Sequence, residues 1–134
     1  MTWSSHEQAH ILALALVGAA LLAGCRANPV QDVRQFFRTT GETHLKAGIR
    51  NYEDGRPKEA ADNLRDAVRA GLSEADEVTA NKYLAFIACS HGQERHCQAY
   101  FRRVLELRPA YELTAVEAGH PSWGPTFRAL KERR

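Results

Sequence analysis

Two cysteines and two histidines lie close together in the second half of the sequence, and they are the residues best suited to metal chemistry. Cys89-Ser90-His91 and His96-Cys97 place two thiols and two imidazoles within nine residues, a set that zinc could use. Zinc sites normally contain cysteines with two to four residues between them, whereas seven residues separate Cys89 from Cys97. The C-x-x-C-H motif of haem attachment and the C-x-x-C redox pair do not occur. We therefore expect no metal and no cofactor.

A disulfide is the other chemistry open to Cys89 and Cys97. The two residues are predicted to lie in the last turn of one helix and the first turn of the next, on either side of Gly92. Antiparallel helices bring such positions together, and an exported domain meets oxidising conditions. The alternative is a pair of small buried thiols, because cysteine packs like a small hydrophobic residue. The spacing favours the disulfide and leaves the alternative open.

Cys25 follows an apolar run and has a different predicted chemistry. Residues 11–22 are apolar throughout, but a helix of that length spans only about 18 Å, less than the roughly 30 Å hydrocarbon core of a bilayer. The run therefore predicts a secretory signal peptide over residues 1–24 rather than a membrane-spanning helix. Leu22-Ala23-Gly24-Cys25 resembles the lipobox of bacterial lipoproteins, in which the cysteine is acylated. Residues 1–10 depart from the lipoprotein pattern because they contain no Lys or Arg. The alternative is a buried core helix that ends in an ordinary cysteine.

Composition and charge limit the remaining functions. The 134 residues are 44% hydrophobic and 25% charged, as in one small globular domain, and the net charge is +2. Basic residues are scattered along the chain among acids, so no nucleic-acid partner is expected. Asp, Glu and His are spread along the predicted solvated faces of helices. We therefore predict no catalytic residues and no enzymatic activity.

The two central cysteines are positioned by a predicted pair of amphipathic helices over residues 81–109. Gly92 interrupts the apolar periodicity and Pro109 ends it. The spacing matches one tetratricopeptide (TPR) repeat at Leu84-Ala85, Cys97, Phe101 and Pro109, whereas Asn81 and Ala88 depart from the aromatic positions of that pattern.

A second hairpin is predicted upstream, with a helix over residues 43–54, a turn at Gly55 and a partner helix that Pro57 opens. Ser73, with Asp76 three residues later, predicts the N-cap of the following helix. We therefore predict an all-α fold with two TPR-like hairpins over residues 41–109. Residues 25–40 would form a lipid-anchored tether, in which residues 30–38 could make one short helix.

The first helix of each TPR unit lines a concave groove, which predicts a surface for a partner. The expected groove positions are mostly apolar or aromatic, where a solvated face would carry charges: Leu45, Ile49, Tyr52, Lys82 and Phe86. The alternative is that Val33, Phe36 and Phe37 of the preceding segment fill this groove.

Residues 110–134 are predicted to form a turn and a capping helix. Repeat arrays need a cap over their last apolar face, and Trp123, Phe127 and Leu130 are expected to cover Phe101 and its neighbours on the last repeat helix. A Trp123 that projects outward as a partner contact is the alternative, because Trp is enriched at such sites.

The lipobox, the two hairpins, the stretch KYLAFIACS and the tail EAGHPSWGPTFR together resemble the TssQ family of lipoproteins associated with type VI secretion systems. The resemblance covers residues 42–130, and it carries over no catalytic residue. It implies an accessory role at the envelope-spanning base of the secretion machine, through contacts with other envelope or secretion-system proteins.

The expected location is the cell envelope, with the protein facing the periplasm on its lipid anchor. Arg26 follows the lipobox cysteine where an Asp would favour inner-membrane retention, so the outer membrane is favoured. The alternative function is a structural or pilotin-like lipoprotein of another envelope assembly.

Overall fold

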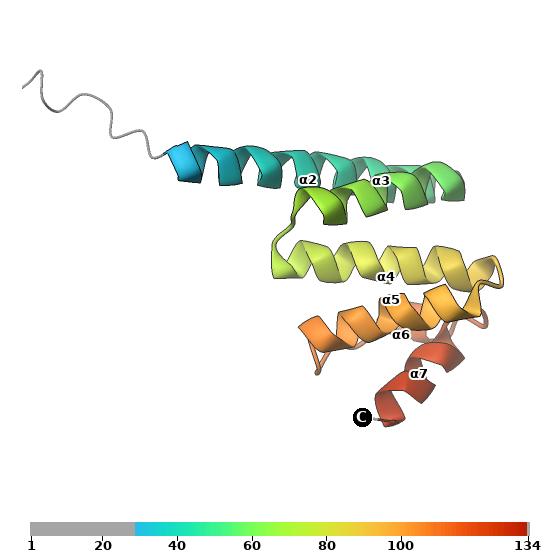
Figure 1. Cartoon of the computed structure of the whole chain (residues 1–134). Coiled ribbons are helices and arrows are strands. Elements are labelled where there is room, and N and C mark those ends of the chain that lie inside the picture. Colours follow the sequence, from blue (N-terminus) through green and yellow to red (C-terminus); the bar gives the residue numbers. More distant parts are fainter. Residues whose placement is uncertain (1–28, 134) are drawn as a thin grey trace, which may run out of the picture. The chain divides into compact units, whose positions relative to one another are not determined.

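The computed structural model describes residues 29–133, and within them the chain forms helices and no strand (Figure 1). This confirms the predicted all-α class. The helices are α2 (Pro29–Glu53), α3 (Pro57–Ala70), α4 (Glu74–Ser90), α5 (Glu94–Leu107), α6 (Ala115–Ala118) and α7 (Gly124–Glu132). Val33–Arg134 makes one compact unit. The predicted signal peptide and Cys25 lie outside the described residues.

Two helical hairpins, α2–α3 and α4–α5, form the body of the compact unit. Gly55 and Gly92 turn the chain with φ of 70° and 69°, a conformation that costs a residue with a Cβ atom more than it costs glycine. Ser73 caps α4, because its side chain accepts a hydrogen bond from the Asp76 backbone N–H at 3.2 Å. The predicted turns and this cap therefore lie where the local sequence placed them.

The first helix differs from its prediction. We expected a helix over residues 43–54 after a tether, but α2 begins at Pro29 and continues without a break through residue 40. The hydroxyl groups of Thr39, Thr40 and Thr43 each donate to the carbonyl four residues earlier, at 2.9 to 3.0 Å. These residues therefore find their hydrogen-bond partners inside the helix and do not end it.

Close backbone approach joins the two helices of the first hairpin. A Cβ atom at Gly48 would lie 2.7 Å from the Leu64 side chain, so only glycine lets α2 and α3 come this near. Leu45 and Leu64 pack there against α4 in a cluster that contains mostly small and aliphatic residues: Leu45, Ala60, Ala61, Leu64, Ala67, Ala80, Leu84 and Ile87.

A second core cluster joins α4 and α5 to the C-terminal segment. Phe101, at its centre, is fully buried and meets Phe127 of α7 edge to face at 5.1 Å between ring centroids. The cluster consists of Ala85, Phe86, Ala88, Cys97, Phe101, Leu105, Leu113, Trp123, Phe127 and Leu130. Helix α7 thus covers the apolar side of the second hairpin, as the capping prediction required of Phe127 and Leu130.

Candidate functional site

The face predicted as a partner groove is covered. Leu45 and Phe86 are only 6% and 3% exposed, and Ile49, Tyr52 and Lys82 are half-buried. The prediction of an open groove is therefore wrong at Leu45 and Phe86. Leu45 belongs to the core of the first hairpin, and the C-terminal segment lies over Phe86.

The upstream segment does not fill that groove either, because the side chains expected to enter it point to solvent. Val33, Phe36 and Phe37 are 54%, 67% and 52% exposed. The groove is filled from the other end of the chain.

Trp123 is the residue that covers α4. Its ring stacks on Phe86, with 4.3 Å between centroids and 19° between planes, rather than on α5 as predicted. The indole Nε1–H donates to the Glu117 carbonyl at 2.8 Å, and the His120 ring also stacks on the indole at 3.4 Å. Trp123 is 7% exposed, so its aromatic face and its polar edge are both used inside the protein. The alternative of an outward-facing partner contact is wrong.

An ion pair joins α4 to the C-terminal segment, at α6. Lys82 Nζ donates to Glu117 Oε1 at 2.5 Å, and the two side chains are only 14% and 19% exposed. Glu117 also accepts the Thr114 backbone N–H at 3.0 Å, completing a capping box at the start of α6.

The electrostatics of this pair follow from its contacts. Burial raises the pKa of the Glu117 carboxyl, but the Lys82 hydrogen bond and the Thr114 amide outweigh it and hold the pKa below its usual 4.5. Burial lowers the pKa of Lys82, but the hydrogen bond to Glu117 and the charges of Glu117, Tyr111 and Tyr83 together outweigh it and leave the pKa raised. Sequence analysis missed Glu117, although Thr114-Ala115-Val116-Glu117 carries the capping-box signal.

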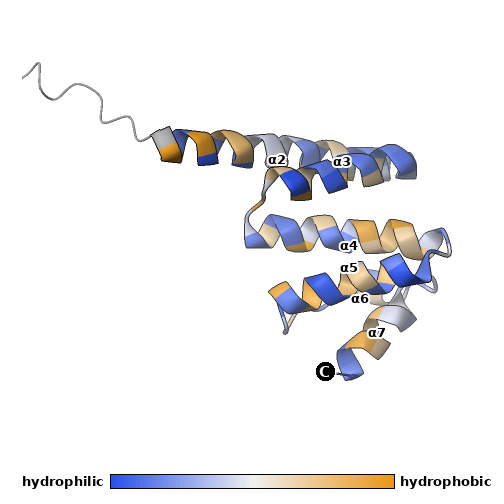
Figure 2. Ribbon diagram, in the orientation of Figure 1, coloured by the Kyte–Doolittle hydropathy of each residue, from blue (hydrophilic) through white to orange (hydrophobic). Residues whose placement is uncertain are grey.

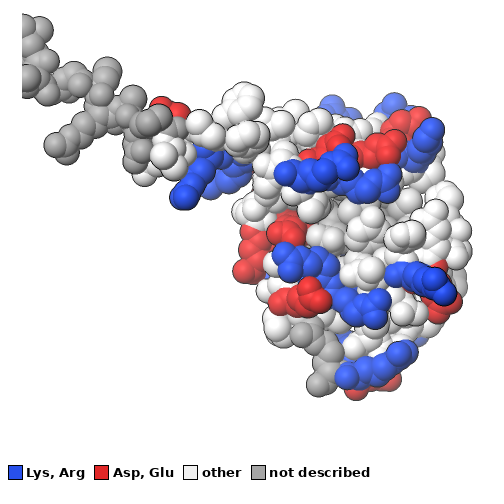
Figure 3. All heavy atoms as spheres, in the orientation of Figure 1, with Lys and Arg blue, Asp and Glu red and all other residues white. Residues whose placement is uncertain are grey.

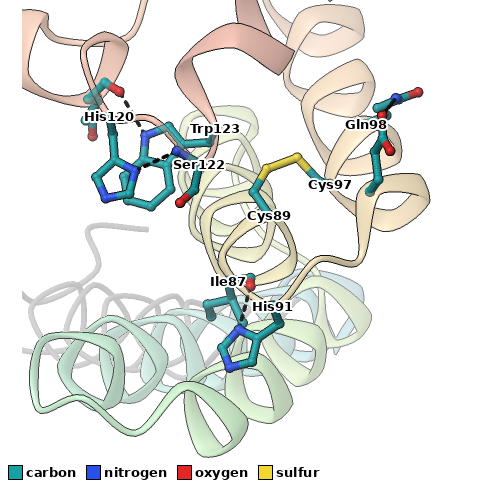
Figure 4. The surroundings of a disulfide bond; sticks show 10 residues. Ile87, Cys89, His91, Cys97, Gln98, His120, Ser122 and Trp123 are labelled. Atoms are coloured by element: carbon teal, nitrogen blue, oxygen red, sulfur yellow. Dashed lines mark hydrogen bonds between the residues drawn. A yellow bond between two sulfur atoms is a disulfide. The ribbon is translucent and has the colours of Figure 1, made fainter.

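Cys89 and Cys97 are joined by a disulfide between α4 and α5, with 5.1 Å between their Cα atoms (Figure 4). This distance lies inside the range of bridged cysteines. His91 points away from the sulfurs, and its Nδ1 lies 2.8 Å from the Ile87 carbonyl oxygen. In the described part of the chain, no three His, Cys, Asp or Glu side chains come together as metal ligands would.

A shallow groove lies between the two hairpins, on the side formed by α3 and α5. We define this inter-hairpin groove by two adjoining depressions, of about 220 and 210 Å³, which share Ala61, Arg65, Ile87 and Gln93. Leu84 and Ala88 add to the apolar floor, and the rim consists of Pro57 and four polar or basic residues: Lys58, His91, His96 and Tyr100. Nothing in the sequence pointed to this groove, because its residues come from three helices.

Charge distinguishes the inter-hairpin groove from its surroundings. Elsewhere on the same face, basic and acidic side chains alternate (Figure 3). Among the described residues that line the groove, by contrast, Lys58 and Arg65 are charged and none is acidic. The Arg65 guanidinium donates a hydrogen bond to Asp62 Oδ1 at 2.6 Å, and Asp62 is not one of the residues that line the groove. This hydrogen bond raises the pKa of the guanidinium. The groove therefore has an apolar floor with a basic edge.

In comparisons with known proteins, no family profile, no curated protein and no solved structure matches this chain. Within residues 29–133, no helix is both long enough and apolar enough to cross a bilayer.

Proposed function

We propose that this protein is a lipid-anchored interaction module of the bacterial cell envelope, built from two TPR-like hairpins and accessory to a type VI secretion system. Cys25 carries the anchor, and the folded unit faces the periplasm from the outer membrane. It acts by binding another protein of the envelope or the secretion machine, without catalysis.

The disulfide is the observation that supports this proposal most directly. Disulfides persist in exported proteins and are rare in the cytosol, and the Cys89–Cys97 bond lies in a chain whose Leu22-Ala23-Gly24-Cys25 resembles a lipobox. Two consecutive helical hairpins with glycine turns support the TPR-like part of the proposal, together with the sequence match at Leu84-Ala85, Cys97, Phe101 and Pro109.

The inter-hairpin groove is the surface we assign to the partner. The groove around Phe86, which was predicted as the partner surface, is occupied by the C-terminal segment. A partner could bind there only if that segment were displaced. A groove with an apolar floor, edged by Lys58 and Arg65, suits an extended or helical segment that carries Asp or Glu beside apolar residues.

Membrane attachment is tested first. Cys25→Ser should abolish fatty-acid labelling and move the protein from the detergent phase to the aqueous phase. If the variant still incorporates label and still partitions into detergent, the anchor assignment is wrong.

Partner binding is tested with a charge reversal in the groove. Arg65→Glu should weaken capture of a secretion-system or envelope protein about tenfold or more, because it places a like charge against an acidic partner. Arg69→Glu is the matched control, since Arg69 lies one turn further along α3, pairs with Asp66 and is 73% exposed outside the groove. Equal capture by both variants would contradict the assignment. Recovery of an outer-membrane pore subunit in place of secretion components would favour the pilotin-like alternative.

A further inference from the structure

The N-terminal part of α2 carries a row of uncovered apolar side chains. We call residues 33–40 the overhang. Val33, Phe36 and Phe37 are each more than half exposed, and Val30, one turn earlier in the same helix, is 57% exposed. Among the described residues, only Val116 adds another large hydrophobic side chain with comparable exposure.

The overhang is uncovered because its partner helix ends. At Gly41 a Cβ atom would lie 2.4 Å from the Gly71 carbonyl oxygen, so the end of α3 reaches Gly41. On the N-terminal side of that point α2 continues without α3 beside it. Figure 2 shows these first turns of α2, on which hydrophobic residues are coloured orange. The chain thus builds an apolar helix face and supplies no segment in the described unit to bury it.

The overhang is amphipathic. At 3.6 residues per turn, Val33, Phe36 and Phe37 share one side of the helix, and Gln35 faces away from it. Arg34 is exposed at one edge of the apolar side, and Arg38 is exposed on the polar side of the helix. A short apolar face with aromatic residues, edged by arginine, is the pattern of helices that lie in the plane of a membrane interface.

The chain itself places this helix beside a membrane if Cys25 is acylated. Pro29 follows Cys25 by four residues, which can span at most about 14 Å. From the start of α2 to Val33 the helix rises only about 6 Å more. We propose that the overhang lies on the bilayer that holds the Cys25 anchor, with Val33, Phe36 and Phe37 in the headgroup region. This inference rests on the lipid anchor of the proposed function.

A second copy of the chain is the competing occupant. The three overhang side chains and Val30 could each bury on the order of 100 Å², or about 800 Å² for two copies together, judged by the size of aromatic side chains. Stable dimers bury about 1,200 Å² or more, and contacts of about 800 Å² are typical of crystal packing. The available area is too small for a stable dimer, whereas an anchored helix needs only to rest on a surface already beside it.

The test uses acylated full-length protein reconstituted into phosphatidylcholine–phosphatidylglycerol vesicles with brominated acyl chains. Phe36→Trp places a fluorophore on the apolar side, and Gln35→Trp places one in the same turn on the polar side that faces away from it. The emission of native tryptophan, which includes Trp123 in the core, is subtracted with the unsubstituted protein. Brominated lipid should quench Phe36→Trp at least about twofold more than Gln35→Trp.

Each other outcome overturns the inference in a distinguishable way. Protein that carries fatty acid and floats with the vesicles, but shows equal or no quenching at the two positions, refutes the membrane contact and leaves the proposed function intact. Phe36→Trp emission that shifts with protein density and ignores bromination assigns the face to a second copy. Absence of fatty acid refutes both proposals together.

Discussion

The overhang at the N-terminal end of the folded unit and the segment after α5 at its C-terminal end both carry aromatic residues, and these residues have opposite surroundings. At the N-terminal end, Phe36 and Phe37 are 67% and 52% exposed; at the C-terminal end, Trp123 and Phe127 are 7% and 3% exposed. Both pairs lie in or directly beside a helix of the folded unit. Their exposed fractions differ because of the path that the backbone takes between each pair and the two hairpins.

A turn makes the C-terminal end fold back. Residues 119–123 leave the helical path between α6 and α7, and the Gly124 N–H bonds to the His120 carbonyl at 2.9 Å. Glycine is required at position 124, because a Cβ atom there would lie 2.2 Å from the Ala118 carbonyl oxygen. Helix α2 has no such break, so its aromatic residues continue straight past the end of α3. Aromatic content alone therefore does not predict burial; a reversal of the chain does.

The largest expected effect is at the covered end. Trp123→Ala should destabilise the unit by about 3–5 kcal/mol, because it empties the space against Phe86 and removes the indole bond to Glu117. Urea unfolding followed by circular dichroism measures this. A folded protein with an unchanged midpoint would show that the C-terminal segment does not stabilise the hairpins.

Removal of the disulfide is expected to come next. The Cys89→Ala, Cys97→Ala double variant opens a loop with a sequence separation of 8, and the loss of that cross-link should cost about 2.5 kcal/mol in the chain-entropy treatment. The overhang is in α2, and the disulfide joins α4 to α5, so the exposure of Val33, Phe36 and Phe37 should not change in this variant. Thiol titration of the denatured protein checks the premise: equal counts with and without reductant would mean that the bond does not form.

The Lys82–Glu117 pair should have a smaller effect that depends on pH. Glu117→Gln should cost about 1–2 kcal/mol near neutral pH, because it weakens a charge-assisted bond that is only partly exposed. The folded pKa of Glu117 lies below the usual 4.5. Its contribution is therefore complete above about pH 4.5 and is lost as the pH falls through the lower folded value.

Stability measured from pH 7 to pH 3 tests this sign. The wild-type protein should converge on Glu117→Gln as the pH falls. Glu112→Gln is the matched control, since Glu112 binds Lys131 from a site that is 71% exposed. A difference between wild type and Glu117→Gln that grows at low pH would contradict the assignment.

The smallest effect is expected at the uncovered end. Phe36→Ala should change the free energy of unfolding by less than about 0.5 kcal/mol, since the side chain is two-thirds exposed and lies beyond the hairpin. The same unfolding measurement applies. A loss near that of Trp123→Ala would mean that the overhang is covered in solution and would remove the contrast between the two ends.

Much of the local structure could be predicted from the sequence because its causes are local. Gly55 and Gly92 turn the chain since glycine readily adopts positive φ, Pro57 starts α3, and Ser73 caps α4 through its own hydroxyl. The helical class and the juxtaposition of Cys89 with Cys97 follow from such signals, because the cysteines lie three residues before and five residues after Gly92.

Burial was decided by the tertiary structure. Phe86 has the helical spacing of a groove residue, and only a segment more than thirty residues later shows that it is a core residue, because Trp123 stacks on it. The same holds for Lys82, whose partner Glu117 is 35 residues away, and for the inter-hairpin groove, which needs α3, α4 and α5 in place. The sequence by itself determined where helices begin, turn and end, since those depend on backbone sterics and nearby hydrogen bonds. Which apolar faces are covered depends on distant segments meeting in space, and only the folded chain decides that.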